Sequence, residues 1–233
     1  MKPRICVSLR AERPTDYPQL IQRAEDAGVD LIEIRLDYLS VDPFSALKNL
    51  KNFVGETSVP MIVTNRVYEQ GGGRRQNEDE RIQILMQAAE VGFEYVDVEL
   101  TTSSIDLIVD KIRDCGSKPL ISFHIFDRTP SIKEMKGLIR SELEAGAAVC
   151  KLITLAKSLN DNFKCLRLLE DMSESARIVC FAMGRKGLIS RVLSPVCGGY
   201  FTFASLIEGR ETAPGQISVN ELKMLYEKLG VYG

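Results

Sequence analysis

The stretch Leu31-Ile32-Glu33-Ile34-Arg35-Leu36-Asp37 alternates apolar and charged residues. Because successive side chains of a β-strand point to opposite faces, the apolar residues at 32, 34 and 36 share one face, and Glu33, Arg35 and Asp37 share the other. If helices cover the apolar face, Glu33 and Arg35 point into an enclosed interior, where burial is costly unless the charges pair or hold a ligand. Taken alone, this stretch fits both a space-filling ion pair and a ligand site.

Seven further short runs of β-branched or apolar residues accompany this strand, and longer segments of helical period separate them. The runs recur about every 29 residues, close to the size of one βαβ unit. The predicted strands are Arg4–Leu9, Leu31–Leu36, Pro60–Thr64, Tyr95–Glu99, Leu120–Phe123, Ala148–Ile153, Arg177–Phe181 and Tyr200–Phe203. The predicted helices are Asp16–Ala27, Asp42–Asn52, Asn77–Val91, Ser103–Asp114, Ser131–Ala145, Leu159–Met172, Lys186–Leu193 and Ser218–Leu229.

Glycines and serines mark the ends and starts of several predicted helices, where a left-handed C′ residue and an N-cap belong. They are Gly28, Gly92, Gly116, Gly146, Ser103, Ser131 and Ser218. Ser131 also has Glu134 three residues on, the spacing of a capping box. No linker or shift of composition interrupts the pattern, so we expect a single domain over residues 1–233. Eight consecutive units favour a closed (β/α)8 TIM barrel, with eight parallel strands and eight helices, over an open doubly wound sheet.

Composition excludes several classes of function. Lys and Arg number 30 against 32 Asp and Glu, a net charge of -2, so no basic field exists to attract nucleic acid or an anionic membrane. No apolar run approaches the roughly 18 residues of a membrane span, and residues 5–9 are too short for a signal-peptide core, so we expect a cytoplasmic protein. The six cysteines form no CxxC pair and the chain has one histidine, so we expect reduced thiols and no metal site.

In such a barrel, functional groups come from the carboxyl-terminal ends of the strands and the loops that follow them. Asp97 and Glu99 repeat the charged pattern on the fourth predicted strand, where we expect them to hold neighbouring cations. Ser8, on the first predicted strand, adds a possible hydroxyl at the same rim. The sequence thus directs attention to this end of the barrel.

His124, the only histidine, closes the fifth predicted strand. A histidine among apolar neighbours is commonly a satisfied core residue, but at a barrel mouth it is a candidate general acid and base. On the next strand Lys151 lies between apolar residues, where burial favours the neutral, nucleophilic amine unless the side chain extends its head to the rim. Together the two residues suit imine chemistry on a ketone, with histidine moving the proton.

Glycine-containing segments follow the third and seventh predicted strands. Residues 183–191, Met-Gly-Arg-Lys-Gly-Leu-Ile-Ser-Arg, fit an anion site in which Arg191 is a fork for a carboxylate, and also fit a solvated basic turn. Gly71-Gly72-Gly73-Arg74 predicts a flexible lid. Neither segment contains GK[ST], so nucleotide binding is not expected.

Several motifs spread along the chain together match those of a known protein family. They are Glu33-Ile-Arg35-Leu-Asp37, Thr64-Asn-Arg66 followed by Gly71-Gly72, Ser122-Phe-His124-Ile-Phe126 with Thr129-Pro130, Lys151, Met183-Gly184 with Gly187 and Ser190-Arg191, and Thr212-Ala-Pro-Gly-Gln216-Ile-Ser-Val-Asn220. With them the chain resembles the type I 3-dehydroquinate dehydratases over nearly its whole length. The resemblance implies a (β/α)8 catalytic domain and a hydro-lyase of the shikimate pathway, part of aromatic amino-acid biosynthesis. It further implies conversion of 3-dehydroquinate to 3-dehydroshikimate, no cofactor, and a homodimer.

The resemblance also implies residue roles. Lys151 is similar to the Schiff-base lysine of the family, His124 to its general acid and base, and Arg191 to the residue that holds the substrate carboxylate. The residues that match the rest of the pocket are Ser8, Glu33, Arg35, Arg66, Thr212 and Gln216 for hydroxyls and neighbouring groups, and Met183 and Phe203 for the apolar sides.

Two positions depart from the family pattern. The family usually has Glu directly before the paired glycines of the third loop, where it assists the histidine, but here Gln70 stands there and Glu69 precedes it. Because only a carboxylate can share protons with His124, we expect Glu69 to assist. Thr212 stands where the family often has Ser, and it retains the hydroxyl.

Two other functions fit the same residues. A Schiff-base aldolase or transaldolase would use Lys151 to attack a sugar ketone and would break a carbon–carbon bond. A barrel kept as a binding or assembly module would retain buried charges without using them, at a cost in stability. Turnover of 3-dehydroquinate to a conjugated enone distinguishes the three.

Overall fold

The computed structural model describes residues 2–206 and 216–232. The strands in the described residues are β1 (Ile5–Arg10), β2 (Leu31–Arg35), β3 (Met61–Thr64), β4 (Tyr95–Glu99), β5 (Lys118–His124), β6 (Val149–Leu155), β7 (Ile178–Met183) and β8 (Thr202–Ala204). The α-helices are α1 (Tyr17–Asp26), α2 (Pro43–Glu56), α3 (Glu78–Val91), α4 (Ile105–Asp114), α5 (Ile132–Glu144), α6 (Asn160–Met172), α7 (Leu188–Leu193) and α8 (Val219–Lys228). Short 3-10 helices are η1 (Pro14–Asp16), η2 (Leu36–Tyr38), η3 (Tyr68–Gln70) and η4 (Arg185–Gly187).

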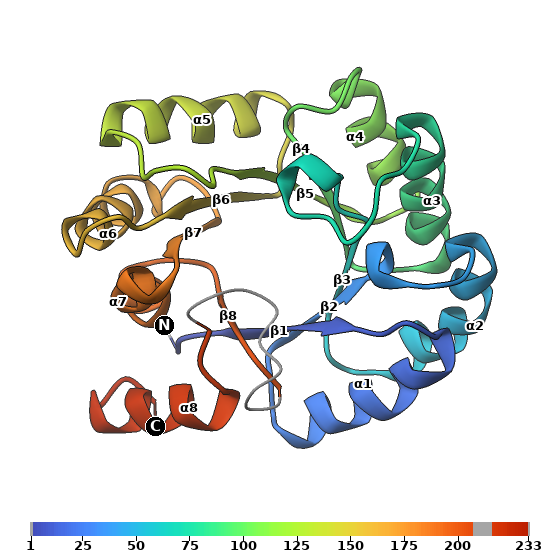
Figure 1. Cartoon of the computed structure of the whole chain (residues 1–233), viewed down its shortest axis with the longest axis horizontal. Helices are drawn as coiled ribbons and strands as arrows, with labels where there is room; N and C mark the ends of the chain where they lie inside the picture. Colours follow the sequence, from blue (N-terminus) through green and yellow to red (C-terminus); the bar gives the residue numbers. More distant parts are fainter. Residues whose placement is uncertain (1, 207–215, 233) are drawn as a thin grey trace.

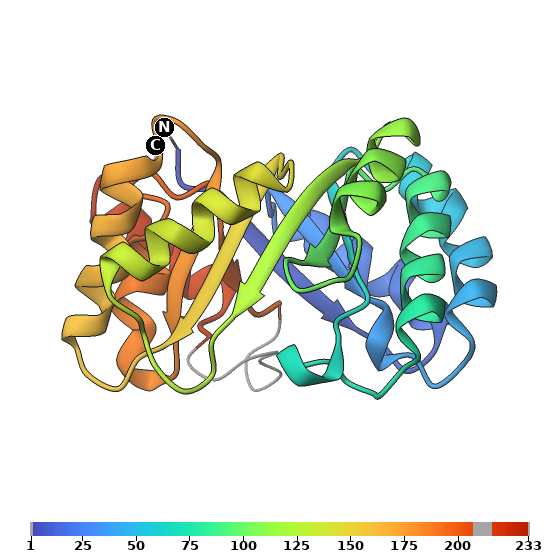
Figure 2. The same ribbon diagram turned by 90° about the horizontal axis from the view of Figure 1, so that it is seen from above.

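The strands lie in the order β7-β6-β5-β4-β3-β2-β1-β8, and every ladder between neighbours is parallel. The two ends of this order meet beside β8, where the Tyr200 N–H donates to the Ile178 carbonyl at 2.7 Å. Helices surround the strands (Figure 1). Viewed from above, β5 and β6 run toward the same edge as η3 (Figure 2). The predicted (β/α)8 barrel is confirmed.

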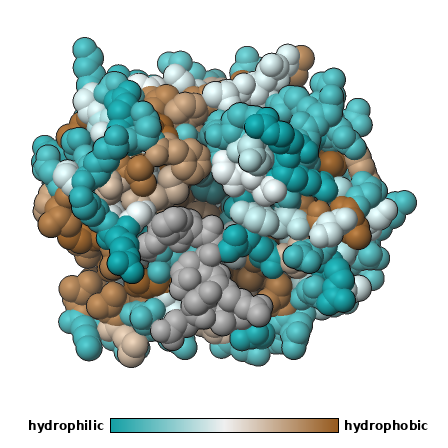
Figure 3. Space-filling view, viewed as in Figure 1, coloured by the Kyte–Doolittle hydropathy of each residue, from teal (hydrophilic) through white to brown (hydrophobic). Residues whose placement is uncertain are grey.

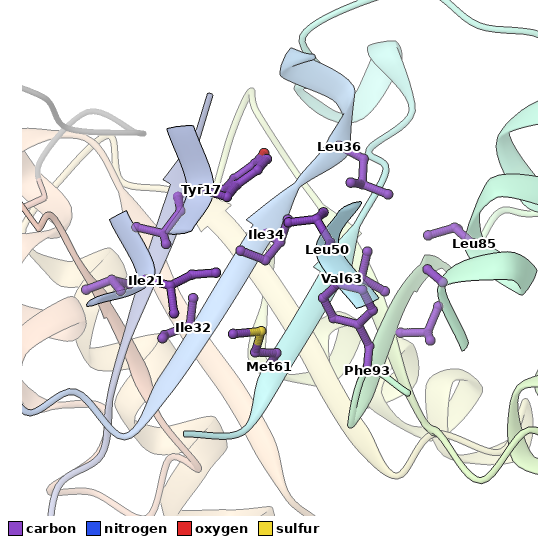
Figure 4. Close-up of a cluster of buried hydrophobic side chains, with 14 of the residues drawn as sticks. Tyr17, Ile21, Ile32, Ile34, Leu36, Leu50, Met61, Val63, Leu85 and Phe93 are labelled. Atoms are coloured by element: carbon purple, nitrogen blue, oxygen red, sulfur yellow. The ribbon is translucent and has the colours of Figure 1, made fainter. Parts of the chain in front are cut away.

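The outer face of β2 carries the apolar half of the alternating stretch. Ile32, Ile34 and Leu36 are fully buried. They pack with Tyr17 of α1 and Leu50 of α2 in the layer between strands and helices (Figure 4). Burial of such a side chain contributes about 1.5–3 kcal/mol, so this layer fixes which face of β2 turns outward. The charged residues of the stretch must therefore face the barrel interior.

Inside the barrel, the side chains change from apolar to charged along the direction of the strands. The amino-terminal part is filled by an apolar cluster that includes Leu31 of β2 and Tyr95 of β4. Two residues further along the same strands, Glu33 and Asp97 are also buried. Because all strands are parallel, the polar side chains gather at the carboxyl-terminal end, where barrels of this type carry their sites.

The predicted cap residues of the helices hold with one exception, although α2 ends at Glu56, later than the predicted Asn52, and α7 begins at Leu188, later than the predicted Lys186. Ser131 and Ser218 form capping boxes at the start of α5 and α8. The four predicted C′ glycines all have positive φ. The N-cap of α4, however, is Ser104 rather than Ser103, with φ 56° and no capping hydrogen bond from its side chain. Ser103 and Ser104 are equally good N-cap residues by type, so the sequence does not distinguish them. The path of the preceding loop determines which one precedes α4.

The six cysteines are free thiols, as predicted. In the part of the chain that the structure describes, no helix combines the length and apolarity that crossing a bilayer requires.

Glu142 on α5 is an ionisable group that the sequence did not single out. It is fully buried, and its carboxyl group lies near the Cys150 thiol and the Lys151 backbone, with no cation paired to it among the described residues. It faces the apolar layer between α5 and β6, close to Cys150. Burial raises the pKa of Glu142 well above its usual value of 4.5 and so favours the protonated form.

Replacing Glu142 by Gln should make the stability of the protein less dependent on pH. The raised folded-state pKa means that this carboxyl stabilises the fold at low pH and that this contribution is lost as pH rises from about 4.5 through the folded-state pKa. Glu142→Gln removes that loss, so the variant should gain about 1–3 kcal/mol relative to wild type between pH 5 and pH 8. Urea unfolding at both pH values measures it. A difference between the two proteins that does not change with pH contradicts the assignment.

Candidate active site

A cavity of about 170 Å³ opens at the carboxyl-terminal end of the barrel. The residues that line it are Ser8, Glu33, Arg35, Arg66, Gln70, Gly71, His124, Phe126, Lys151, Ile153, Phe181, Met183, Arg191, Phe203 and Gln216. It therefore brings together the predicted site residues other than Glu69 and Thr212, and Thr212 lies outside the described residues. Among the described residues, no group of three or more His, Cys, Asp or Glu is placed to hold a metal ion.

Lys151 reaches into this cavity from the middle of β6. Its Nζ lies 3.0 Å from Asp97 Oδ2 and 3.2 Å from Glu33 Oε1, and 4.7 Å from the centre of the Phe203 ring. The apolar neighbours of Lys151 in the sequence suggested apolar surroundings for its side chain, but the structure places two carboxylates beside it. Because side chains alternate along a strand, Leu152 packs outward against the helices, while the lysine itself meets two carboxylates. These two carboxylates hold Nζ in a defined place.

Glu33 and Asp97 are both ionised in this arrangement. Burial alone would raise the pKa of each, but nearby cations outweigh it. Lys151 and then Arg35 lower the pKa of Glu33, and Arg66 and then Lys151 lower the pKa of Asp97. The floor of the cavity is thus a set of alternating buried charges rather than one isolated ion pair.

Arg66 links this floor to β4. Its Nη2 donates to Asp97 at 2.6 Å, and its Nη1 donates to Glu99 at 2.7 Å and to the Ser122 hydroxyl at 2.6 Å. The prediction that Asp97 and Glu99 hold neighbouring cations is confirmed. The sequence did not anticipate that Asp97 would also contact Lys151, although its alternation on β4 repeats that of Glu33 on β2.

His124 ends β5, next to β6 in the barrel, and Ser122 of the same strand pairs in register with Lys151. The His124 ring stacks on Phe126 with ring centroids 6.2 Å apart, and its Nδ1 is buried without a hydrogen-bond partner among the described residues. Burial, together with Arg66 and Lys151, lowers the pKa of His124 well below 6.5. The imidazole is therefore uncharged at neutral pH and can accept a proton.

The third loop presents Gln70, not Glu69, to the histidine. Gln70 Oε1 accepts the backbone N–H of His124 at 3.0 Å, while its Nε2 donates to the Thr101 hydroxyl at 3.0 Å. The Glu69 carboxylate instead pairs with Arg75 at 3.0 Å, and both of these side chains are largely exposed. The structure thus does not bring Glu69 to the cavity, because consecutive residues of the η3 turn point in different directions.

Arg191 of α7 is the cation of the cavity that lacks a carboxylate partner among the described residues. It is 1 % exposed, and its guanidinium lies 4.3 Å from the centre of the Phe181 ring. Nη1 donates to the Phe203 carbonyl at 3.4 Å, but Nη2 has no partner among the described residues. Burial lowers the pKa of Arg191 to about 9, so it remains charged at neutral pH. This buried position excludes a solvated basic turn at Arg191 and leaves a site for an anion.

The assembled features define a class of protein, a (β/α)8 barrel with a buried lysine, a neutral histidine and a buried arginine that has no carboxylate partner among the described residues, all in one cavity at its carboxyl-terminal end. Comparison with known proteins identifies the class. The family model of type I 3-dehydroquinase matches residues 5–232. A 3-dehydroquinate dehydratase of Methanosarcina barkeri is 34% identical over 217 residues, which cover 91% of this chain and 90% of that protein.

Solved structures give the same result. 3-Dehydroquinate dehydratase from Geobacillus kaustophilus matches with a TM-score of 0.91 and 25% identity, covering 100% of this chain and 93% of that one. A type I 3-dehydroquinate dehydratase from Clostridium difficile, solved with covalently modified comenic acid, matches with a TM-score of 0.87 and 26% identity, covering 98% and 92%. The chain belongs to the type I 3-dehydroquinase family, and it is accordingly a hydro-lyase.

The pKa of His124 should rise when the neighbouring lysine loses its charge. Lys151→Met removes one of the cations that, after burial, disfavour the imidazolium. Because the chain has one histidine, its NMR signals report this pKa without ambiguity. We expect a midpoint below 6.5 in the wild-type protein and an upward shift in Lys151→Met. An unchanged midpoint in the variant would show that the lysine charge does not act on the ring.

Proposed function

We propose that this chain dehydrates 3-dehydroquinate to 3-dehydroshikimate, a step of the shikimate pathway, through a Schiff base on Lys151 with His124 as general acid and base. One observation carries the proposal. The Lys151 amine, the uncharged His124 and the charged Arg191 line a single cavity, so a nucleophile, a proton carrier and a carboxylate partner can act on one small molecule.

In the proposed complex, the substrate carboxylate takes the unused Nη2 of Arg191. A charge-assisted bond there replaces an orphaned buried donor, so the gain is larger than at an exposed arginine. The residues proposed to hold hydroxyls and neighbouring groups are Ser8, Glu33, Arg35, Arg66, Thr212 and Gln216. Met183 and Phe203 line the apolar sides of the ring.

The first half of the reaction forms the imine. Glu33 and Asp97 hold the Lys151 nitrogen in place, and it attacks the ring ketone as the neutral amine. His124, kept neutral by its surroundings, takes up and returns protons as the carbinolamine forms and loses water. The positive charge of the resulting iminium forms beside the same two carboxylates, which stabilise it.

The second half eliminates water from the substrate. His124 removes a proton from the carbon beside the imine carbon, and the electron pair of that bond moves toward the iminium nitrogen. The adjacent carbon–oxygen bond then breaks, and the tertiary hydroxyl leaves as water with the proton from His124. Hydrolysis of the imine releases the conjugated product and the free lysine. The C. difficile relative was solved with covalently modified comenic acid, and a covalent adduct accords with the nucleophile proposed here.

The rest of the proposal concerns the whole protein. We propose that it forms a single cytoplasmic catalytic domain that uses no cofactor and works as a homodimer. A groove of about 940 Å³ outside the barrel, lined in part by Phe163 of α6, supports a contact with a second copy. Exposed apolar side chains lie on α6, α7 and α8 or directly beside their ends, on the side where brown atoms cluster in Figure 3. They are Leu159, Phe163, Ile189, Val196, Met224, Leu225 and Leu229.

Borohydride should trap the imine on Lys151. With 3-dehydroquinate present, reduction should leave a stable adduct that peptide mass mapping places at this residue, because the amine is the nucleophile of the cavity. His124→Ala should still form the adduct while turnover falls by about 10²–10⁴-fold, since it removes only the proton carrier. The absence of an adduct at Lys151 in active enzyme would exclude the imine, and a fully active His124→Ala would exclude the shuttle.

Arg191→Ala should severely weaken substrate binding and turnover. The substrate carboxylate would lose its charged partner in a buried site, a loss of about 2–5 kcal/mol. Steady-state kinetics measures the effect. Arg113→Ala is the control, because Arg113 is an exposed arginine of α4 that lines neither the cavity nor the groove beside α6. Wild-type kinetics for Arg191→Ala, with an unchanged circular dichroism spectrum, would contradict the carboxylate assignment.

A further inference from the structure

Asp37, which follows β2, is buried and accepts four hydrogen bonds. Arg35 donates to it twice, from Nε at 2.9 Å to Oδ1 and from Nη2 at 2.7 Å to Oδ2. The other two donors are backbone N–H groups, that of Gly73 at 2.8 Å to Oδ2 and that of Arg66 at 3.4 Å to Oδ1. One carboxylate therefore joins the end of β2 to both ends of the third loop, residues 66–73.

The same loop is bound to β2 by further contacts. Arg35 Nη2 also donates to the Gly71 carbonyl at 3.2 Å, and Gly71 adopts a left-handed conformation with φ 87°. A Cβ on Gly72 would lie 2.2 Å from the Arg66 carbonyl oxygen, and one on Gly73 would lie 2.8 Å from the Asp37 carbonyl oxygen. The triple glycine, which the sequence suggested was a flexible lid, thus permits close packing of backbone on backbone.

The loop held by Asp37 carries the residue that contacts His124. Gln70 lies between the two N–H groups that donate to Asp37, and its side chain accepts the backbone N–H of His124 at 3.0 Å. A continuous set of hydrogen bonds thus runs from Asp37 through the loop to the end of β5. We propose that Asp37 is a positioning residue, which fixes the third loop so that Gln70 holds His124 in its working place. This inference rests on the proposed function, because it assigns a purpose to the position of His124.

Asp37→Asn tests the anchoring directly. The amide NH2 of Asn would face Arg35 Nη2 and the Gly73 N–H, which are both donors, so two of the four bonds are lost. The loop is followed by Arg74 and Arg75, both trypsin sites. We expect cleavage there at least about tenfold faster than in wild type, because proteolysis requires the loop to open locally. Asp30→Asn is the matched control, because Asp30 accepts the Ile5 N–H at the other end of the barrel.

Gly72→Ala provides a second route to the same displaced loop should Asp37→Asn fail to fold, since its Cβ cannot fit against Arg66. Gly55→Ala is its control, because a Cβ there meets nothing within 4 Å. Peptide mapping should place the accelerated cleavage at Arg74 or Arg75 in the loop variants alone. Unchanged cleavage in folded Asp37→Asn or Gly72→Ala would overturn the anchoring.

A double-mutant cycle then tests the link to His124. Asp37→Asn and Gln70→Ala should each lower kcat for 3-dehydroquinate by about tenfold, since misplacing a proton carrier slows its step. If Asp37 acts through Gln70, Asp37→Asn should cost much less in the Gln70→Ala background. Equal costs in both backgrounds would overturn the link. Absence of turnover in wild type would count against the proposed function instead, and the cleavage measurements would still decide the anchoring.

Discussion

Charges buried at the carboxyl-terminal end of the barrel must balance one another, and the rest of the site depends on this constraint. An unpaired charge in the interior costs several kcal/mol, so each buried carboxylate needs a cation and each cation a carboxylate. Asp97 forms ion pairs with both Arg66 and Lys151, and Glu33 forms a second ion pair with Lys151. Glu99 extends the set outward to Arg81 of α3, whose Nη1 lies 2.7 Å away. The lysine is held in place because it belongs to this network.

Arg191 stands apart from this balance, and the proposed function uses this exception to bind the substrate carboxylate. Its guanidinium packs on an aromatic ring and retains a donor without a partner among the described residues. A carboxylate ligand satisfies that donor and supplies the missing charge in one step. The barrel thus combines two regions of different character, a neutralised floor that positions the lysine and a wall with an excess positive charge.

The sequence predicted most of the framework because the framework follows from local periodicity. The alternation at 31–37 assigned Ile32, Ile34 and Leu36 to the outer layer, and their complete burial agrees. Polar residues that break the apolar pattern of the strands also drew attention to His124 at the end of β5 and to Lys151 within β6. Local signals failed where neighbours in sequence are equivalent, as with Ser103 and Ser104 or with Glu69 and Gln70. No pattern within a turn states which of two adjacent side chains faces inward.

The sequence by itself determined the order of strands and helices, the face of β2 that meets the helices, and the family of the chain, because all three are encoded over short stretches or in motif spacing. Only the tertiary structure decided the partners of the charges. Lys151 meets Glu33 across 118 positions of sequence, and Gln70 meets His124 across 54. Such contacts depend on closure of the barrel, which brings the ends of distant strands together. Identical side chains at other registers would have paired differently.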